Sequence, residues 1–368
     1  TINNLQNNDS SKTQPTTLFS ESVPFSDPTQ IAEKFGHILF KTFGTPSDLK
    51  DLPVYPVNSP TPELTITKAE FDTALKKCNK KSAPGNDGIS NRIVSNSPEN
   101  IKEIILKIFQ FSLKLGHIPK SWKAAKIIMI HKSGKPKQEF TSYRPISLLN
   151  CLAKLLEKII NFKITKWAEE NDIFPPEQSG FRTKRSCQDH ILRLTQHITN
   201  GFNDIEDKKF TGAVFFDLEK AFDMAPHSGI INKLEKNNLN PCLTNWVKSF
   251  RLKDLPGQME NKISNSFSIN RGVPQGSCLS PTLFNIYFSD IVNSIPKSTD
   301  KALFADDLGI WYSDSSLKLI EFNLKRGINR ISEFCDKWGL LLNKKKTFFT
   351  VFCPAGLRKN YLRTYNLN

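Results

Sequence analysis

Three aspartates stand at the ends of apolar runs, and this placement limits the folds that the chain can adopt. Asp217 closes the run 210–218 (FTGAVFFDL), and Asp306 and Asp307 separate two apolar stretches within 302–312 (ALFADDLGIWY). The first run predicts a buried strand and the second a hairpin with both aspartates at its tip. A lone buried carboxylate is costly unless it is paired or binds a cation. The three carboxylates therefore suggest a magnesium site, and an ordinary Asp-rich turn is the alternative for the hairpin tip.

The charge of the chain points to a polyanionic partner. Lys and Arg number 51 against 36 Asp and Glu, a formal net charge of +15. Residues 1–62 hold four lysines and six acids, so residues 63–368 carry +17. A body this basic favours nucleic acid as partner, with solubility alone as the alternative.

Two other classes are excluded by composition. No stretch approaches the roughly 18 uninterrupted apolar residues of a membrane span, which excludes an integral membrane protein. The seven cysteines are scattered and odd in number, which indicates reduced intracellular thiols and neither a disulfide framework nor a zinc site.

The N-terminal residues 1–62 carry eight of the 22 prolines and are rich in Asn, Thr and Ser. This composition predicts a linker or surface-wrapping arm, in which only 31–43 is apolar enough for a short helix. The chain begins without Met or a signal peptide, which suggests a fragment of a longer product. Order is expected to begin at Thr67, which forms a capping box with Glu70.

A second helix opens at Pro98 and is expected to stop before Pro119. Its inward side is expected to consist of four isoleucines, Ile101, Ile104, Ile105 and Ile108. Further along, the periodicity predicts a strand at 126–131 and helices at 152–167, 280–295 and 317–338.

Four ordered motifs surround the aspartates, and four more precede them. The runs around the aspartates are 215–223 (FFDLEKAFD), 271–281 (RGVPQGSCLSP), 304–307 (FADD) and 338–347 (WGLLLNKKKT). The upstream runs are 80–89, 122–131, 142–149 (SYRPISLL) and 178–182 (QSGFR). In order and spacing, residues 64 to about 352 resemble the reverse transcriptases of non-LTR retrotransposons, and within that family the jockey-type elements.

The resemblance implies an α/β (α+β) fold of the right-hand polymerase type. Fingers would span 63–205, and a palm with an antiparallel sheet would span 206–352. Residues 353–368 would start a truncated C-terminal region, and the thumb would be missing.

The implied activity is that of an RNA-directed DNA polymerase, which adds deoxynucleoside triphosphates to a primer 3′-hydroxyl. Its partners would be an RNA template and a DNA primer, without a membrane, at an intracellular and specifically nuclear site of action. Two Mg²⁺ ions, with Mn²⁺ as a substitute, would be held by Asp217, Asp306, Asp307 and the carbonyl of Leu218. Lys346 would protonate the pyrophosphate leaving group, and the alternative for the run 344–346 is a solvated basic face.

Five further residues would bind the nucleotide. Phe222 would lie under the incoming sugar and select deoxynucleotides, with a plain core phenylalanine as the alternative. Gln275 and Gly276 would shape the pocket, and their alternative is a loop at a helix entry. Arg144 and Lys126 would neutralise the triphosphate, and solvated basic side chains are the alternative.

The chain departs from the family pattern at two places. Met224-Ala225-Pro226 replaces a bulkier segment, and 250–263 lacks the basic-aromatic strand pattern expected there. These departures keep open a catalytically inactive nucleic-acid-binding remnant of such a polymerase. An intron-encoded maturase is a third possibility, which the amino-acid sequences of the motifs disfavour.

Overall fold

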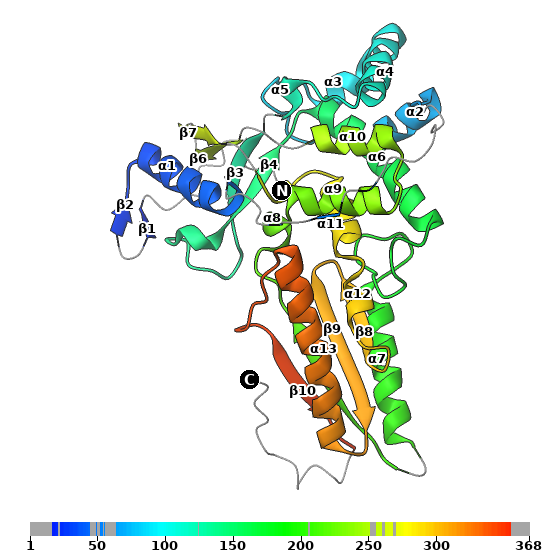
Figure 1. Cartoon of the computed structure of the whole chain (residues 1–368). Coiled ribbons are helices and arrows are strands. Elements are labelled where there is room, and N and C mark those ends of the chain that lie inside the picture. The colour runs from blue at the N-terminus through cyan, green and yellow to red at the C-terminus, as the bar shows by residue number, and fades with distance from the viewer. Residues whose placement is uncertain are drawn as a thin grey trace. The chain divides into compact units, whose positions relative to one another are not determined.

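The computed structural model describes residues 17–20, 23–44, 49, 52–53, 55, 64–123, 125–204, 207–250, 255–259, 262–267 and 270–354, with the backbone alone at 126, 255–259 and 262–267. It forms two compact units (Figure 1). Unit 1 comprises Thr1–Trp167 and Pro226–Thr282, and unit 2 comprises Ala168–Ala225 and Leu283–Asn368.

Unit 1 contains a four-stranded sheet of order β4-β3-β6-β7. Strand β3 (Lys126–His131) pairs antiparallel with β4 (Tyr143–Leu148) and parallel with β6 (Leu255–Met259), which forms an antiparallel pair with β7 (Lys262–Phe267). The predicted strand at 126–131 is thus confirmed. The β6–β7 pair overlaps the stretch 250–263, in which the sequence lacks the expected strand pattern.

The N-terminal segment of unit 1 contributes to the core. The short strands β1 (Leu18–Ser20) and β2 (Val23–Phe25) precede helix α1 (Pro28–Leu39) and the π-helical turn η2 (Phe40–Gly44). Phe35 of α1 lies 4.7 Å from the ring of Phe140 and belongs to one buried cluster with Leu18 and Ile127. The composition of this segment predicted a linker or surface-wrapping arm because prolines and polar residues are frequent in it. A few of its apolar side chains are nevertheless buried.

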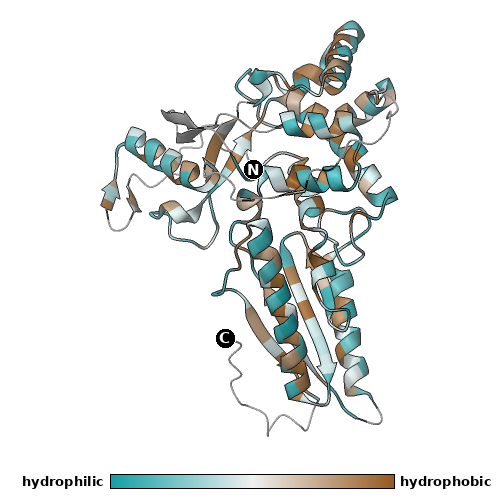
Figure 2. Cartoon of the chain, viewed as in Figure 1, coloured by the Kyte–Doolittle hydropathy of each residue, from teal (hydrophilic) through white to brown (hydrophobic). Residues whose placement is uncertain are grey.

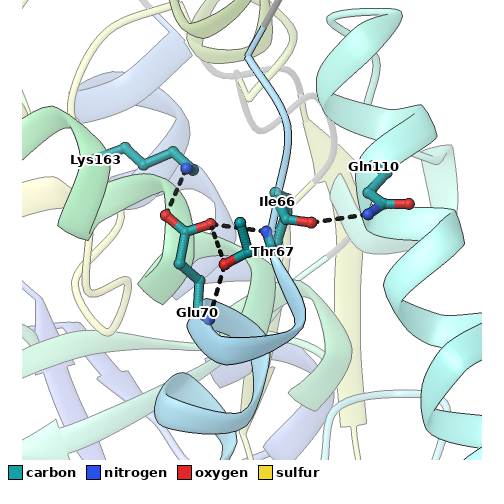
Figure 3. Close-up of polar contacts among 5 residues, drawn as sticks. All are labelled: Ile66, Thr67, Glu70, Gln110 and Lys163. Atoms are coloured by element: carbon teal, nitrogen blue, oxygen red, sulfur yellow. Dashed lines mark hydrogen bonds and ion pairs between the residues drawn. The ribbon is translucent and has the colours of Figure 1, made fainter.

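The remaining helices of unit 1 include a predicted capping box. They are α2 (Lys68–Lys76), α3 (Asn91–Asn96), α4 (Glu99–Lys114), α5 (Lys120–Lys123), α9 (His227–Lys236) and α10 (Pro241–Ser249), with the 3₁₀ turn η3 (Phe140–Ser142). Thr67 and Glu70 cap α2 reciprocally, and Lys163 lies 2.6 Å from the Glu70 carboxylate (Figure 3). The Gln110 amide donates to the Ile66 carbonyl at 2.8 Å, so α2 is tied to α4 as well.

The predicted inward side of α4 is wrong. Ile101, Ile104 and Ile108 are 41%, 52% and 44% exposed, and the buried residues are Phe109, Ser112 and Leu113. Helix α4 is apolar around most of its circumference, so periodicity alone does not identify its buried side. Ser112 instead accepts a hydrogen bond from the Trp246 indole of α10, which fixes the packed face.

Unit 2 is built on an antiparallel sheet of order β10-β5-β9-β8. Its strands are β5 (Phe210–Phe216), β8 (Asp300–Phe304), β9 (Asp307–Asp314) and β10 (Phe348–Phe352). Its helices are α7 (Cys187–Phe202), α8 (Ala221–Met224), α12 (Ile291–Ser294) and α13 (Leu317–Trp338). Two of the three unit boundaries fall within α6 (Cys151–Glu170) and α11 (Ser280–Phe288), and the third falls between Ala225 and Pro226. The expected helix at 280–295 is therefore two helices, interrupted at Ser289–Asp290.

Helices α7 and α13 cover opposite faces of this sheet. Ile310 of β9 lies against Gly327 of α13, whereas the neighbouring Trp311 packs with Leu194 of α7. Successive side chains of a strand point to opposite faces, so the two helices sandwich the sheet. The visible side of α13 is largely hydrophilic in Figure 2, as expected for a helix that buries Ile320 and Leu324 on its other side.

Candidate active site

The strand register of unit 2 brings the three aspartates to one end of the sheet. Phe216 pairs with Leu308 between β5 and β9, so Asp217 and Asp307 face each other one position further along. Asp306 lies in the two-residue turn of the β8–β9 hairpin, whose last pair is Phe304 with Asp307. The predicted hairpin is confirmed. The carboxylates converge because the two antiparallel strand pairs, β5–β9 and β8–β9, finish at the same end of the sheet.

The carboxylate of Asp217 is held by residues more than a hundred positions away. The Asn343 side-chain amide donates to Asp217 Oδ2 at 2.8 Å, and Lys346 Nζ lies 3.3 Å from the same oxygen. Lys346 is 68% exposed, so its ion pair contributes little to stability. Asn343 is the firmer support of the Asp217 side chain.

The backbone locks this arrangement in register. The N–H of Asn343 donates to the Asp217 carbonyl at 2.8 Å, and the N–H of Glu219 donates to the Leu341 carbonyl at 2.8 Å. Leu218 and Leu342 form the bridge between these two bonds, and Leu218 is buried. The segment 341–343 thus lies antiparallel to 217–219 and extends the pairing beyond the end of β5 that carries Asp217.

The hairpin tip is fixed by a buried glutamine. The Gln178 amide donates to the Ala305 carbonyl at 3.1 Å, and its oxygen accepts from the Ala305 N–H at 2.9 Å. Gln178 is 1% exposed, and Ala305 adopts a left-handed φ of 59° that alanine disfavours. A Cβ on Gly180 would overlap the Ala305 nitrogen, so this close approach requires glycine.

Burial and mutual repulsion perturb two of the carboxylates. Burial raises the pKa of Asp306 to about 6, and the charges of Asp307 and Asp217 add to this effect. Burial and the Asp217 charge also raise the pKa of Asp307, which the Lys346 ammonium opposes. Carboxyl groups that are held together against their repulsion are suited to a cation, which lowers such pKa values when it binds.

The donor set fits a metal ion that is also held by substrate. Within the ranges that the structure describes, no group of three or more His, Cys, Asp or Glu side chains forms a complete protein cage for a metal. Magnesium in phosphate-handling sites is held by one or two carboxylates together with waters and substrate phosphates. Asp217 and Asp307, which face each other across β5 and β9, carry carboxylate oxygens of this kind.

Phe222, the predicted sugar-contacting residue, also lies in unit 2. Its ring stacks on the fully buried Phe284 with centroids 4.4 Å apart and forms a T-shaped pair with Phe181, with centroids 6.3 Å apart. Phe222 itself is only half-buried. A rigid aromatic surface therefore remains partly open to a ligand.

A cavity of about 360 Å³ adjoins Asp217 and Asp307 on the α7 face of the sheet. Apolar side chains line most of it, among them Phe215, Trp311 and Leu194. This apolar lining adjoins the strand ends that carry Asp217 and Asp307.

The four other predicted site residues lie in unit 1. Gln275 is half-buried and its carbonyl accepts from the Ser147 N–H at 2.8 Å, while Gly276 is exposed with a φ of 119°. Arg144 is an exposed residue of β4 opposite Ile130. Lys126 begins β3, and its side chain lies outside the described part.

Two supporting residues were missed by the sequence analysis. Asn343 and Gln178 both lie within quoted motifs, but only the tertiary structure reveals that they hold Asp217 and the Asp306 turn. Their membership of these motifs is the signal that could have singled them out. No helix of the described residues is long and apolar enough to cross a membrane.

Comparisons with known proteins place these features in context. Residues 130–362 match the family model "Reverse transcriptase (RNA-dependent DNA polymerase)". A probable RNA-directed DNA polymerase from transposon BS of Drosophila melanogaster is 33% identical over 87% of this chain and 36% of its own length. The RNA-directed DNA polymerase from mobile element jockey of the same species is 30% identical over 82% of this chain and 34% of its own.

The chain thus spans about a third of the length of these curated relatives. Among solved structures, apo telomerase from Candida tropicalis truncated from its C-terminal domain matches with a TM-score of 0.48 and 14% identity. That match covers 65% of this chain and 52% of the telomerase chain.

Proposed function

Since this chain belongs to the reverse transcriptase (RNA-dependent DNA polymerase) family of non-LTR retrotransposons, we propose that it carries the polymerase activity of such an element. It would add deoxynucleoside triphosphates to the 3′-hydroxyl of a DNA primer on an RNA template. The observation that carries this proposal is the placement of Asp217 opposite Asp307, with Asp306 in the adjoining turn.

Reverse transcriptases generally use divalent metal ions. For this chain we propose two Mg²⁺ ions, replaceable by Mn²⁺, held by Asp217, Asp306, Asp307 and the Leu218 carbonyl. Bound ions would activate the primer hydroxyl and neutralise the triphosphate in an in-line displacement. The raised pKa values of Asp306 and Asp307 support the assignment, because a cation bound between these carboxyl groups would offset their burial and mutual repulsion.

Asn343 and Lys346, which both contact Asp217, would have different roles in the reaction. Asn343 orients Asp217 through its 2.8 Å hydrogen bond. Lys346 is mostly exposed and would leave Asp217 to donate a proton to the departing pyrophosphate. The flexible four-carbon stem of lysine suits such a movement.

The nucleotide-binding roles follow from motif position. Phe222 would lie under the sugar and exclude a 2′-hydroxyl, supported by its stacking on Phe284. Gln275 and Gly276 would shape the nucleotide pocket, and Arg144 and Lys126 would bind the triphosphate. The exposed guanidinium of Arg144 can form a bidentate contact with phosphate oxygens.

The domain assignment and the site of action are proposals of the same kind. Residues 63–205 would be fingers and residues 206–352 palm, in a nuclear protein. The +17 charge of residues 63–368 would bind template and primer through their phosphates.

Primer extension on poly(rA)/oligo(dT) with dTTP tests the proposed function. Extension with Mg²⁺, retention of activity with Mn²⁺ and loss with EDTA are expected. Duplex binding without extension in either metal would identify a nucleic-acid-binding remnant instead.

A further inference from the structure

A buried carboxyl group on α6 is not explained by the proposed catalytic steps. Glu157 is 1% exposed, and its Oε2 accepts a hydrogen bond of 2.6 Å from the Ser277 hydroxyl. The thiol of Cys278 lies 3.9 Å from the same oxygen. Glu157 thus reaches directly into the loop that follows Pro274, which contains Gln275 and Gly276.

Several hydrogen bonds among the described residues hold the loop, and Glu157 provides one of them. Ser277 Oγ accepts the Leu279 N–H at 3.1 Å while donating to Glu157, so the carboxyl group orients a hydroxyl that in turn fixes the backbone. Ser280 Oγ donates to the Pro274 carbonyl at 2.9 Å and closes the loop on itself. The Ser147 N–H of β4 donates to the Gln275 carbonyl and ties the loop to the sheet.

The conformation between these anchors depends on close fit. Gly276 has a φ of 119°, and a Cβ there would come within 2.7 Å of the Ser147 carbonyl oxygen. Small displacements of Ser277 therefore shift Gly276 against β4. The loop has little freedom to adjust without losing one of its anchors.

The surroundings of Glu157 are unusual for a carboxyl group. It borders a small cavity together with Trp122, Trp246 and Lys123. Burial raises its pKa to about 7, although the hydrogen bond from Ser277 and the charge of Lys154 favour the ionised form. Burial of a carboxyl group is costly, and the hydrogen bond from Ser277 offsets part of this cost.

We propose that Glu157 is a positioning residue, which sets the backbone of Gln275 and Gly276 through Ser277 and thereby the affinity for the incoming deoxynucleoside triphosphate. This inference rests on the proposed function for its substrate. Glu157 touches no reacting atom in this role, so it acts on nucleotide binding and leaves the chemical step unchanged. A purely structural role would lower stability alone.

Steady-state kinetics separate the two roles. Glu157→Leu removes the hydrogen bond from Ser277. The KM for dTTP is expected to rise about tenfold, because this matches the loss of a single charge-assisted hydrogen bond, and kcat should stay within about twofold. Glu157→Gln keeps an acceptor oxygen for Ser277 and should restore most of the affinity. Glu103→Gln, an exposed carboxylate of α4, is the matched control and should leave both constants unchanged.

Ser277→Ala removes the same hydrogen bond without altering the packing of α6, so it decides the matter if Glu157→Leu does not fold. The double variant should show no rise in KM beyond that of Ser277→Ala, because Ser277→Ala already removes the hydrogen bond to Glu157 together with the one from the Leu279 N–H. An unchanged KM in Ser277→Ala, or additive effects in the double variant, would overturn the proposal.

A readout without catalysis keeps this inference separate from the proposed function. Amide hydrogen exchange of residues 275–279 should accelerate in Ser277→Ala and stay at the unaltered rate in Glu103→Gln. If the unaltered chain does not extend primers, the proposed function fails, and the exchange measurement still tests the positioning. Unchanged exchange in Ser277→Ala would contradict it.

Discussion

Asp217 and Asp307 lie directly opposite each other, one position beyond the last paired residues of the antiparallel strands β5 and β9. Burial and the charge of Asp217 raise the pKa of Asp307, and both charges add to the effect of burial on the pKa of Asp306 in the adjoining turn. The strand register thus creates a concentrated negative charge in a chain whose net charge is +15. Several consequences of this geometry can be measured.

Asn343→Ala removes the amide that orients Asp217 and is expected to lower kcat about ten- to hundredfold, as for other residues that support a metal ligand. The KM for dTTP should stay close to that of the unaltered chain. Asn329→Ala, on the exposed side of α13, is the matched control. Single-turnover extension measures the effect, and an unchanged rate would mean that Asp217 needs no such support.

Gln178→Ala leaves the N–H and carbonyl of Ala305 without their partner. Since both groups are buried, the free energy of unfolding should fall by about 1–3 kcal/mol. Activity should fall too, because the turn that carries Asp306 loses its support. Urea denaturation measures the stability, with the exposed Gln196→Ala of α7 as control. Equal stability of the two variants would contradict the role of Gln178.

Phe222→Ala is expected to raise the kcat/KM for ribonucleotides relative to deoxynucleotides by about ten- to hundredfold. The physical reason is steric, since the ring is held in place by Phe284 and would no longer exclude a 2′-hydroxyl. Competing dTTP and UTP in one extension reaction gives the ratio directly. A lower melting temperature with an unchanged ratio would indicate that Phe222 is only a core residue.

Glu157→Gln should change the pH dependence of stability. The folded pKa of about 7 lies above the ordinary value of 4.5, so the folded state is destabilised as pH rises through this window and the loss is complete above pH 7. The variant should therefore be more stable than the unaltered chain at pH 8 by up to about 3 kcal/mol, and equal to it below pH 4.5. Chemical denaturation across this range tests the prediction. A constant difference between the two proteins would contradict the raised pKa.

Local patterns predicted local structure well in this chain. The hairpin at 302–312 and the capping box at Thr67 need only neighbouring residues, and both are confirmed. The helix at 317–338 is confirmed as well, because α13 has the same bounds, and Gly339 ends it in a left-handed conformation. In each case the signal is carried by residues close together in the sequence.

Features that depend on distant residues could not be predicted in the same way. The buried side of α4 depends on Trp246 of α10, and the support of Asp217 comes from Asn343. Composition likewise did not reveal that Phe35 packs on Phe140. The site aspartates were found because a motif marks them, whereas their supports are fixed by tertiary packing. The catalytic and nucleotide-binding roles themselves stay predictions.

The most direct measurement is the rate of magnesium-dependent dTMP incorporation by Asp306→Asn. Loss of this carboxylate should reduce the rate at least about a thousandfold, or roughly 4 kcal/mol of transition-state stabilisation. The melting temperature should not fall, because the substitution removes a buried charge from a repulsive cluster. Asp336→Asn, an exposed residue of α13, should retain the full rate. Incorporation by Asp306→Asn within tenfold of the unaltered chain would contradict the assignment of these aspartates as the catalytic centre.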